Sequence, residues 1–146
     1  MIREARKEDL QEILELYLSL HETAVPEKDA YLLETWNQII EDQSHHLIVC
    51  EVDGRIVSSC ICVVIPNLKR NVRPYAFLEN VVTHCDHRGN GYAKACLNYA
   101  RQIARDSGCY KMMLLTGAKS EKTLDFYAKA GYNSSDKKAF IQWLDK

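Results

Sequence analysis

The chain has 146 residues, enough to bury a full hydrophobic core, and we expect one domain over residues 1–146. A hydrophobic fraction of 47% and a charged fraction of 27% exclude a disordered or fibrous protein. A formal net charge of −1 argues against the broad basic face of a nucleic-acid-binding protein. The longest apolar run, residues 56–65, is too short to cross a bilayer, and residues 1–4 lead into no signal-peptide core. We therefore expect a cytoplasmic protein with neither nucleic acid nor membrane as a partner.

The six cysteines indicate free thiols rather than a metal site. Four of them lie inside apolar patterns, where a thiol behaves as a small buried hydrophobe: Cys50, Cys60, Cys62 and Cys96. No pair has the Cys-x-x-Cys spacing that is typical of zinc sites. We expect reduced thiols and no bound metal.

The first half of the chain predicts a β-α-α-β-β order. A short strand is expected over residues 2–5, and apolar spacing from residue 8 indicates an amphipathic helix with Leu10, Ile13, Leu14, Tyr17 and Leu20 on one face. A second helix over about residues 29–41 should bury Leu33, Trp36, Ile39 and Ile40. Strands at 45–51 and 55–65 flank Asp53-Gly54, a strong hairpin signal. Small and β-branched residues in the second of these strands favour a central place in a sheet.

The second half predicts a loop, a strand, a long helix, a strand and a helix, at residues 66–74, 76–83, 93–108, 110–116 and 120–130. Two short strands are expected within residues 132–144. The whole order is β-α-α-β-β-β-α-β-α-β-β, which indicates an α/β or α+β domain with a mixed sheet. The loop carries Lys69, Arg70 and Arg73, and it is either a solvated surface or a lip that attracts an anionic substrate.

A glycine-containing turn, Arg88-Gly89-Asn90-Gly91-Tyr92-Ala93, joins the strand at 76–83 to the long helix. The N–H groups at a helix N-terminus have no intrahelical partner, and the helix dipole there favours negative charge. Glycines let the backbone approach a ligand closely, so the turn predicts a cradle for phosphate or diphosphate. Lys94 stands where a dinucleotide-binding motif needs glycine, and no Walker sequence is present, which argues against a nucleotide-binding regulator.

This turn resembles the acetyl-coenzyme A signature of the GNAT N-acetyltransferases, Arg/Gln-x-x-Gly-x-Gly/Ala, with Arg88, Gly91 and Ala93 in register. Residues 126–132, Phe-Tyr-Ala-Lys-Ala-Gly-Tyr, resemble the second landmark of that family, Phe-Tyr-x-x-x-Gly-Phe/Tyr. The resemblance extends along essentially the whole chain. It implies a mixed, mostly antiparallel sheet with about four helices, in which the strands near 77–83 and 110–116 run parallel and splay apart around the pantetheine arm.

The resemblance also implies a set of cofactor-binding residues for acetyl-coenzyme A (acetyl-CoA), which serves as a co-substrate. These are Val81, Val82, Thr83, Arg88, Gly89, Asn90, Gly91, Tyr92, Ala93 and Ser120. The main-chain N–H of Val81 or Val82 would polarise the thioester carbonyl, a contact worth about 3 kcal/mol of barrier. Ser120 stands where many members carry asparagine, and Thr123 where many carry alanine, so the contact of Ser120 depends on its hydroxyl.

Tyr127 and Glu79 are the candidate catalytic residues. In the family, the tyrosine of the Phe-Tyr pair points at the cofactor sulfur and can protonate the departing thiolate. Glu79 lies in an apolar strand, where a carboxylate is costly unless it is hydrogen-bonded or exposed in a cleft. The glucosamine-phosphate acetyltransferases of this family resemble this stretch in placing an acidic residue there, as a base or as a group that positions the substrate. Asn80, which alternation places opposite Glu79 unless a bulge intervenes, Arg73 and Tyr75 are candidate substrate contacts.

The leading hypothesis is an acyltransferase that moves an acetyl group from acetyl-CoA to a primary amine by direct attack in a ternary complex. The short chain and near-neutral charge favour a small-molecule amine. Two alternatives stay open: a protein acetyltransferase acting on N-termini or lysines, and a non-catalytic coenzyme A-binding sensor or interaction module. Whether two copies associate as a homodimer also stays open.

Overall fold

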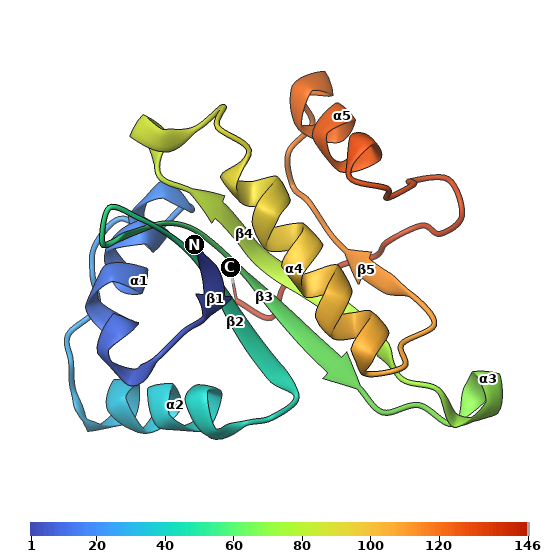
Figure 1. The fold of residues 1–146 in the computed structure, drawn as a ribbon, viewed down its shortest axis with the longest axis horizontal. Helices are drawn as coiled ribbons and strands as arrows, with labels where there is room; N and C mark the ends of the chain where they lie inside the picture. Colours follow the sequence, from blue (N-terminus) through green and yellow to red (C-terminus); the bar gives the residue numbers. More distant parts are fainter. Residues whose placement is uncertain (146) are drawn as a thin grey trace.

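A mixed five-stranded sheet organises the computed structural model, which describes residues 1–145 (Figure 1). Its strands are β1 (Ile2–Glu4), β2 (His45–Val52), β3 (Arg55–Ile65), β4 (Tyr75–Thr83) and β5 (Met112–Leu114). Their order in space follows their order in the sequence, so β3 is central, as its composition predicts. Three neighbouring pairs are antiparallel and only β4 and β5 run parallel. The mixed, mostly antiparallel sheet expected from the resemblance is confirmed.

Helices cover both faces of this sheet (Figure 1). They are α1 (Leu10–Leu16), α2 (Ala30–Glu41), the irregular turn α3 (Lys69–Val72), α4 (Tyr92–Asp106) and α5 (Glu121–Lys129). Three 3₁₀ turns join them, η1 (Lys7–Asp9), η2 (Tyr17–Ser19) and η3 (Cys85–His87). Each of these helices, within residues 1–145, is too short or too polar to span a membrane.

The two faces of the sheet have separate cores. One, the α4-side core, contains the buried residues Ile48, Cys50, Val57, Cys60, Cys62, Ala76, Leu78, Cys96, Leu97, Ala100 and Ala104. The other, the α1-side core, contains Ile13, Leu16, Trp36, Leu47, Val49, Ile56 and Val82. The four cysteines predicted to be buried thiols are all in the first core and are free. Burial raises the pKa of Cys62 and of Cys96 to about 12, which keeps both thiols protonated.

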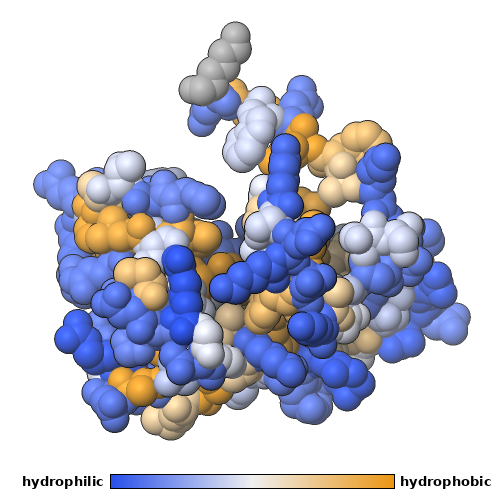
Figure 2. Space-filling model, turned by 90° about the horizontal axis from the view of Figure 1, so that it is seen from above, coloured by the Kyte–Doolittle hydropathy of each residue, from blue (hydrophilic) through white to orange (hydrophobic). Residues whose placement is uncertain are grey.

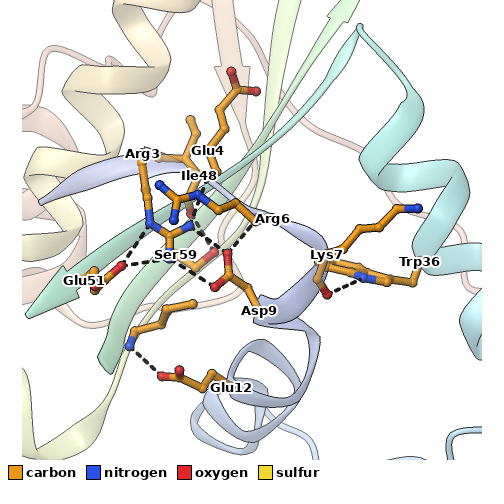
Figure 3. Close-up of polar contacts among 11 residues, drawn as sticks. Arg3, Glu4, Arg6, Lys7, Asp9, Glu12, Trp36, Ile48, Glu51 and Ser59 are labelled. Atoms are coloured by element: carbon orange, nitrogen blue, oxygen red, sulfur yellow. Dashed lines mark hydrogen bonds and ion pairs between the residues drawn. The ribbon is translucent and has the colours of Figure 1, made fainter. Parts of the chain in front are cut away.

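A buried ion pair fastens β1 and the first helical turn to β2 (Figure 3). The Arg3 guanidinium donates to both carboxylate oxygens of Asp9, at 2.7 and 3.0 Å, and to Oε2 of Glu51 at 2.8 Å. The Arg6 main-chain N–H donates to Asp9 Oδ2 at 2.7 Å, so this carboxylate also orders the start of η1. The cluster joins two neighbouring segments, β1 and η1, to Glu51, which lies 48 residues after Arg3.

The structure corrects three expectations. Leu33 is 45% exposed, because the buried stripe of α2 passes through Leu32 and Trp36 instead. The strand expected over residues 110–116 is confined to Met112–Leu114, since the chain leaves β4 after that point. No strand forms in the described part of the stretch 132–144, where an Asn133 side-chain turn is followed by an exposed, unpaired segment.

We expect Asp9→Ala to lower the free energy of unfolding by about 3 kcal/mol, the range for breaking a buried ion pair, because Arg3 would lose its bidentate partner. Urea unfolding of parent and variant measures this difference. Glu34→Ala, which removes an exposed carboxylate from α2, is the matched control and should change stability by less than about 0.5 kcal/mol.

The same pair sets a pH dependence. Burial alone would raise the pKa of Asp9, but hydrogen bonds from Arg3 and the Arg6 N–H outweigh it and hold the pKa below its ordinary 3.8. The stabilisation is therefore complete above about pH 5 and is lost as the pH falls through the folded value, below 3.8. A stability gap between parent and Asp9→Ala that widens on acidification would contradict this assignment.

Candidate active site

A β-bulge interrupts β4 at Asn80. Ile61 pairs with Glu79 and Ser59 with Val82, so Cys60 alone faces both Asn80 and Val81. Asn80 adopts a left-handed backbone conformation, with φ of 52°, which asparagine tolerates better than most residues. The extra residue reverses the facing of the strand: Leu78 and Val81 pack in the α4-side core, whereas Val82 packs in the α1-side core. The sequence left undecided whether a bulge interrupts the strand at Asn80, and the structure shows that one does.

The strands β4 and β5 separate at the same point. Their pairing covers only Ala76 with Met112, Phe77 with Met113 and Leu78 with Leu114. Within the described residues, β4 therefore has no strand partner on this side from Glu79 to Thr83. The edge of β4 from the bulge onward is open to an extended ligand, as the resemblance implies for pantetheine.

The predicted cradle follows β4 and the short turn η3, and it ends at the N-terminus of α4. Gly89 and Gly91 have φ of 80° and 81°, and Gly91 is the N-cap residue of α4 without a side-chain cap. The first helical bond runs from Ala95 N–H to Gly91 O, so the preceding N–H groups of the helix have no helical partner. They lie where the positive end of the helix dipole attracts an anion.

Asn90 holds this turn from within. Its side-chain amide donates to the main-chain carbonyls of His87, at 3.0 Å, and Arg88, at 3.3 Å. With these carbonyls engaged, the turn keeps one shape and its amide N–H groups stay available. Arg88 turns back and donates to the Thr83 carbonyl at 3.4 Å, which ties the cradle to the end of β4.

Tyr127 lies on the α4 side of the sheet. It packs against the α4-side core, and its ring contacts Phe126 and Tyr132 edge-on, with centroids 5.1 and 6.3 Å apart. Burial raises the pKa of Tyr127, and the thiol of Cys60, the residue opposite the bulge, adds to this rise. The hydroxyl therefore stays protonated well above neutral pH and can donate a proton.

Glu79 and Asn80 point to the other face of the sheet. Glu79 pairs in register with Ile61, which packs against the α1-side core, and its side chain is exposed, so the carboxylate keeps its contact with water. Burial raises the pKa of Tyr17, and the nearby Asn80 amide works against that rise. Tyr17 and Ile61 also line an apolar cavity of about 390 Å³ between α1, α2 and the sheet. Neither Glu79 nor Asn80 lines this cavity, but each neighbours a residue that does, Ile61 for Glu79 and Tyr17 for Asn80.

Ser120 caps α5, where its hydroxyl oxygen accepts the Thr123 N–H at 3.3 Å. Two other candidates lie at the far end of α4 from the cradle. Arg73 donates to the carbonyls of Gly108 and Cys109, at 3.1 and 3.2 Å, beyond the C-terminus of α4. Tyr75 lies beside Tyr110 at the start of β4, roughly 20 Å from the cradle along the α4 axis.

Two further tyrosines, Tyr17 and Tyr132, could not be assigned to the site from the sequence motifs alone. Tyr17 was assigned to the apolar face of a helix, and only its contact with Asn80 brings it to the site. Tyr132 closes the second motif, and burial raises its pKa as well. The spacing of that motif was a usable signal for Tyr132, because five residues after Tyr127 the chain has passed the helix end and turned back.

The model of the family described as acetyltransferase (GNAT) family matches residues 10–132 of this chain. That match covers four of the five strands, β2 to β5, together with the bulge, the cradle and both motifs. The chain therefore belongs to the GNAT acetyltransferase family.

Individual relatives agree with this assignment. The chain is 37% identical, over 84 residues, to a glucosamine 6-phosphate N-acetyltransferase of Trypanosoma brucei brucei, and 27% identical, over 150 residues, to an uncharacterized N-acetyltransferase of Methanocaldococcus jannaschii. These matches cover 58% and 98% of this chain but only 55% and 64% of the relatives. A solved structure of a suspected acetyltransferase from Agrobacterium tumefaciens is similar with a TM-score of 0.90 and 31% identity, over 98% of this chain and 99% of that one.

We expect Gly91→Ala to weaken acetyl-CoA binding about tenfold, because alanine in the left-handed region costs roughly 1–2 kcal/mol and the turn would relax away from its shape. Isothermal titration calorimetry measures the affinity. Gly108→Ala is the matched control: its φ is 80°, no neighbour lies within 4 Å of an added Cβ at either site, and it lies beyond the other end of α4. Equal affinities in the two variants would contradict the assignment of the cradle.

Proposed function

We propose that this chain transfers the acetyl group of acetyl-CoA to a primary amine of a small molecule, by direct attack in a ternary complex. The observation that supports the proposal is that Tyr127 and Glu79, to which we assign the proton transfers, lie on opposite sides of the sheet. Tyr127 lies on the α4 side of β4 and Glu79 points to the opposite side. Between them, β4 has lost its partner strand and its edge is open.

The cradle and the open edge together provide a binding path for the co-substrate. The free N–H groups at the head of α4 would hold the diphosphate, and the main chain of β4 beyond Glu79 would pair with pantetheine in place of a strand. This path brings the thioester to the bulge. The N–H of Val81 or Val82 would then donate to its carbonyl oxygen, where negative charge develops during attack.

Proton transfers complete the reaction. Glu79, through water, would take a proton from the acceptor ammonium, which makes the nitrogen nucleophilic. The nitrogen attacks the thioester carbonyl carbon, the carbon–sulfur bond breaks, and Tyr127 would give its hydroxyl proton to the departing thiolate. The second proton, which the nitrogen loses as the amide forms, would return through water to the tyrosinate. Burial raises the pKa of Tyr127, so the phenol still holds its proton when the thiolate forms.

The acceptor would enter from the α1 side, where Glu79, Asn80 and Tyr17 lie beside the apolar cavity. A cavity of about 390 Å³ suits a small molecule rather than a folded protein surface. An amino sugar phosphate is the first acceptor to test, because a relative with 37% identity is named for glucosamine 6-phosphate. A thiol-release assay with acetyl-CoA and a panel of amines tests the proposal, and coenzyme A binding without release for every amine would favour the sensor alternative.

We expect Tyr127→Phe to lower kcat at least tenfold, because the thiolate would depart without its proton donor, while acetyl-CoA affinity changes little. Steady-state kinetics and calorimetry measure the two quantities. Tyr132→Phe removes a phenol whose ring lies 6.3 Å away and is the matched control. If Tyr132→Phe lowers kcat and Tyr127→Phe does not, the proton donor is misassigned.

We expect Glu79→Gln to lower kcat/KM by about 100-fold near neutral pH, because the amide cannot accept the ammonium proton. The deficit should shrink as the pH approaches the pKa of the free acceptor amine, where the nucleophile is already uncharged. A pH profile of kcat/KM measures this, with Glu121→Gln, an exposed carboxylate at the start of α5, as the control. A deficit that is constant across the pH range would assign Glu79 to positioning the substrate.

A further inference from the structure

The cavity between α1, α2 and the sheet has an almost entirely apolar lining. Eleven of its fourteen lining residues are aliphatic, aromatic or proline, and they include Ile13, Trp36 and Leu47 of the α1-side core. Hydrophobic residues also reach the molecular surface on the side formed by α1 and α2, at the left of Figure 2. A ligand in this cavity therefore needs an apolar body, because a polar one would lose its hydrogen bonds to water.

The charge on the lining of this cavity is negative. Glu27 and Asp29, both exposed, are its charged residues, and within residues 1–145 no lysine, arginine or histidine lines it, Lys28 included. The N-terminus of α2 lies here, but the Asp29 carboxylate already accepts the Leu32 N–H at 2.9 Å and occupies the positive end of the helix dipole. The cavity thus favours a cation over a phosphate, for which arginine and lysine are the usual partners.

Two lining residues connect the cavity to the proposed site of acetyl transfer. Ile61 pairs in register with Glu79, and the Cβ atoms of residues paired in this way lie roughly 5 Å apart on the same face of the sheet. Tyr17 lies near the Asn80 amide at the bulge. A body that fills the cavity can therefore present an amine to Glu79 through a short linker.

Given the acetyl transfer proposed above, on which this inference rests, we propose that the acceptor is a primary amine with an apolar body. The body is an aromatic ring or a branched alkyl group, and a short linker joins it to the nitrogen. The body occupies the cavity, and the ammonium lies beside the Glu79 carboxylate, which takes its proton. An amino sugar phosphate fits this site poorly, because its phosphate meets no cation among the lining residues.

A thiol-release assay on the full chain with acetyl-CoA and three amines tests this substrate class. The amines are 2-phenylethylamine, ethylamine, which lacks the apolar body, and glucosamine 6-phosphate. We expect kcat/KM for 2-phenylethylamine to exceed that for glucosamine 6-phosphate roughly 100-fold or more, because only the former buries its body without an unpaired charge. Glucosamine 6-phosphate as the better acceptor overturns this inference and leaves the acetyl transfer itself supported.

A variant that fills the cavity assigns the preference to this place in the fold. Thr35 lines the cavity from α2 and is partly buried, so Thr35→Phe puts a ring where the acceptor body should lie. kcat/KM for 2-phenylethylamine should fall roughly tenfold or more, whereas kcat/KM for ethylamine and acetyl-CoA affinity should stay unchanged. Leu33→Phe, on the same helix but outside the lining, is the matched control. An equal loss for both amines, or no loss for either, overturns the inference.

Tryptophan fluorescence measures binding without the reaction. The chain has two tryptophans, and in a Trp143→Phe variant only Trp36, in the cavity wall, remains. With coenzyme A present, saturating 2-phenylethylamine should change the Trp36 emission, whereas glucosamine 6-phosphate at the same concentration should not. If this change occurs but no amine is acetylated, the ligand class is supported and the acetyl transfer fails. A Trp36 emission that 2-phenylethylamine leaves unchanged overturns the inference.

Discussion

The extra residue in β4 is the constraint on which the site depends. A regular strand would keep Val81 and Val82 facing as alternation from Leu78 dictates and would pair along its full length. Asn80, in the left-handed region, instead reverses the facing of everything after it, and the pairing with β5 stops one residue before Glu79. The bulge thus begins where the pairing with β5 ends, and it leaves Glu79 on one face of the sheet and Tyr127 on the other.

The cradle differs from the bulge in that main-chain N–H groups, rather than side chains, would contact the ligand. Two glycines with positive φ set the turn, and the Asn90 amide engages its carbonyls. The rest of the turn is anchored at both ends, by Arg88 on the Thr83 carbonyl and by α4 packing through Cys96, Leu97 and Ala100. An anion at this point would meet N–H groups that are already fixed in direction, so little ordering would be needed on binding.

Features set by local chemistry could be predicted from the sequence. Residues that tolerate a positive φ mark three of these features in the sequence. They are the Asp53-Gly54 hairpin, the helix end at Gly108 and the glycine turn before α4. The bulge could not be predicted, because asparagine in a strand is compatible with regular pairing as well as with a bulge. Tyr17 could not be assigned either, since its contact with Asn80 joins segments over 60 residues apart in the sequence. The strands expected after Tyr132 failed for a related reason: apolar residues favour a strand, but a strand also needs a neighbour in reach.

The two edges of the sheet show how the site and the free C-terminal segment are connected. At one edge, β1 is short and is held by Arg3, whose charge is bonded to Asp9 and Glu51 and discourages further pairing. At the other edge, β5 carries no such charge and consists of Met112, Met113 and Leu114. It is short because the chain must leave β4 to open the site, and this departure also leaves α5 with little sheet to cover. The same departure leaves the edge of β4 open beyond Leu78, and within residues 1–145 neither the outer edge of β5 nor the apolar segment after α5 has a strand partner.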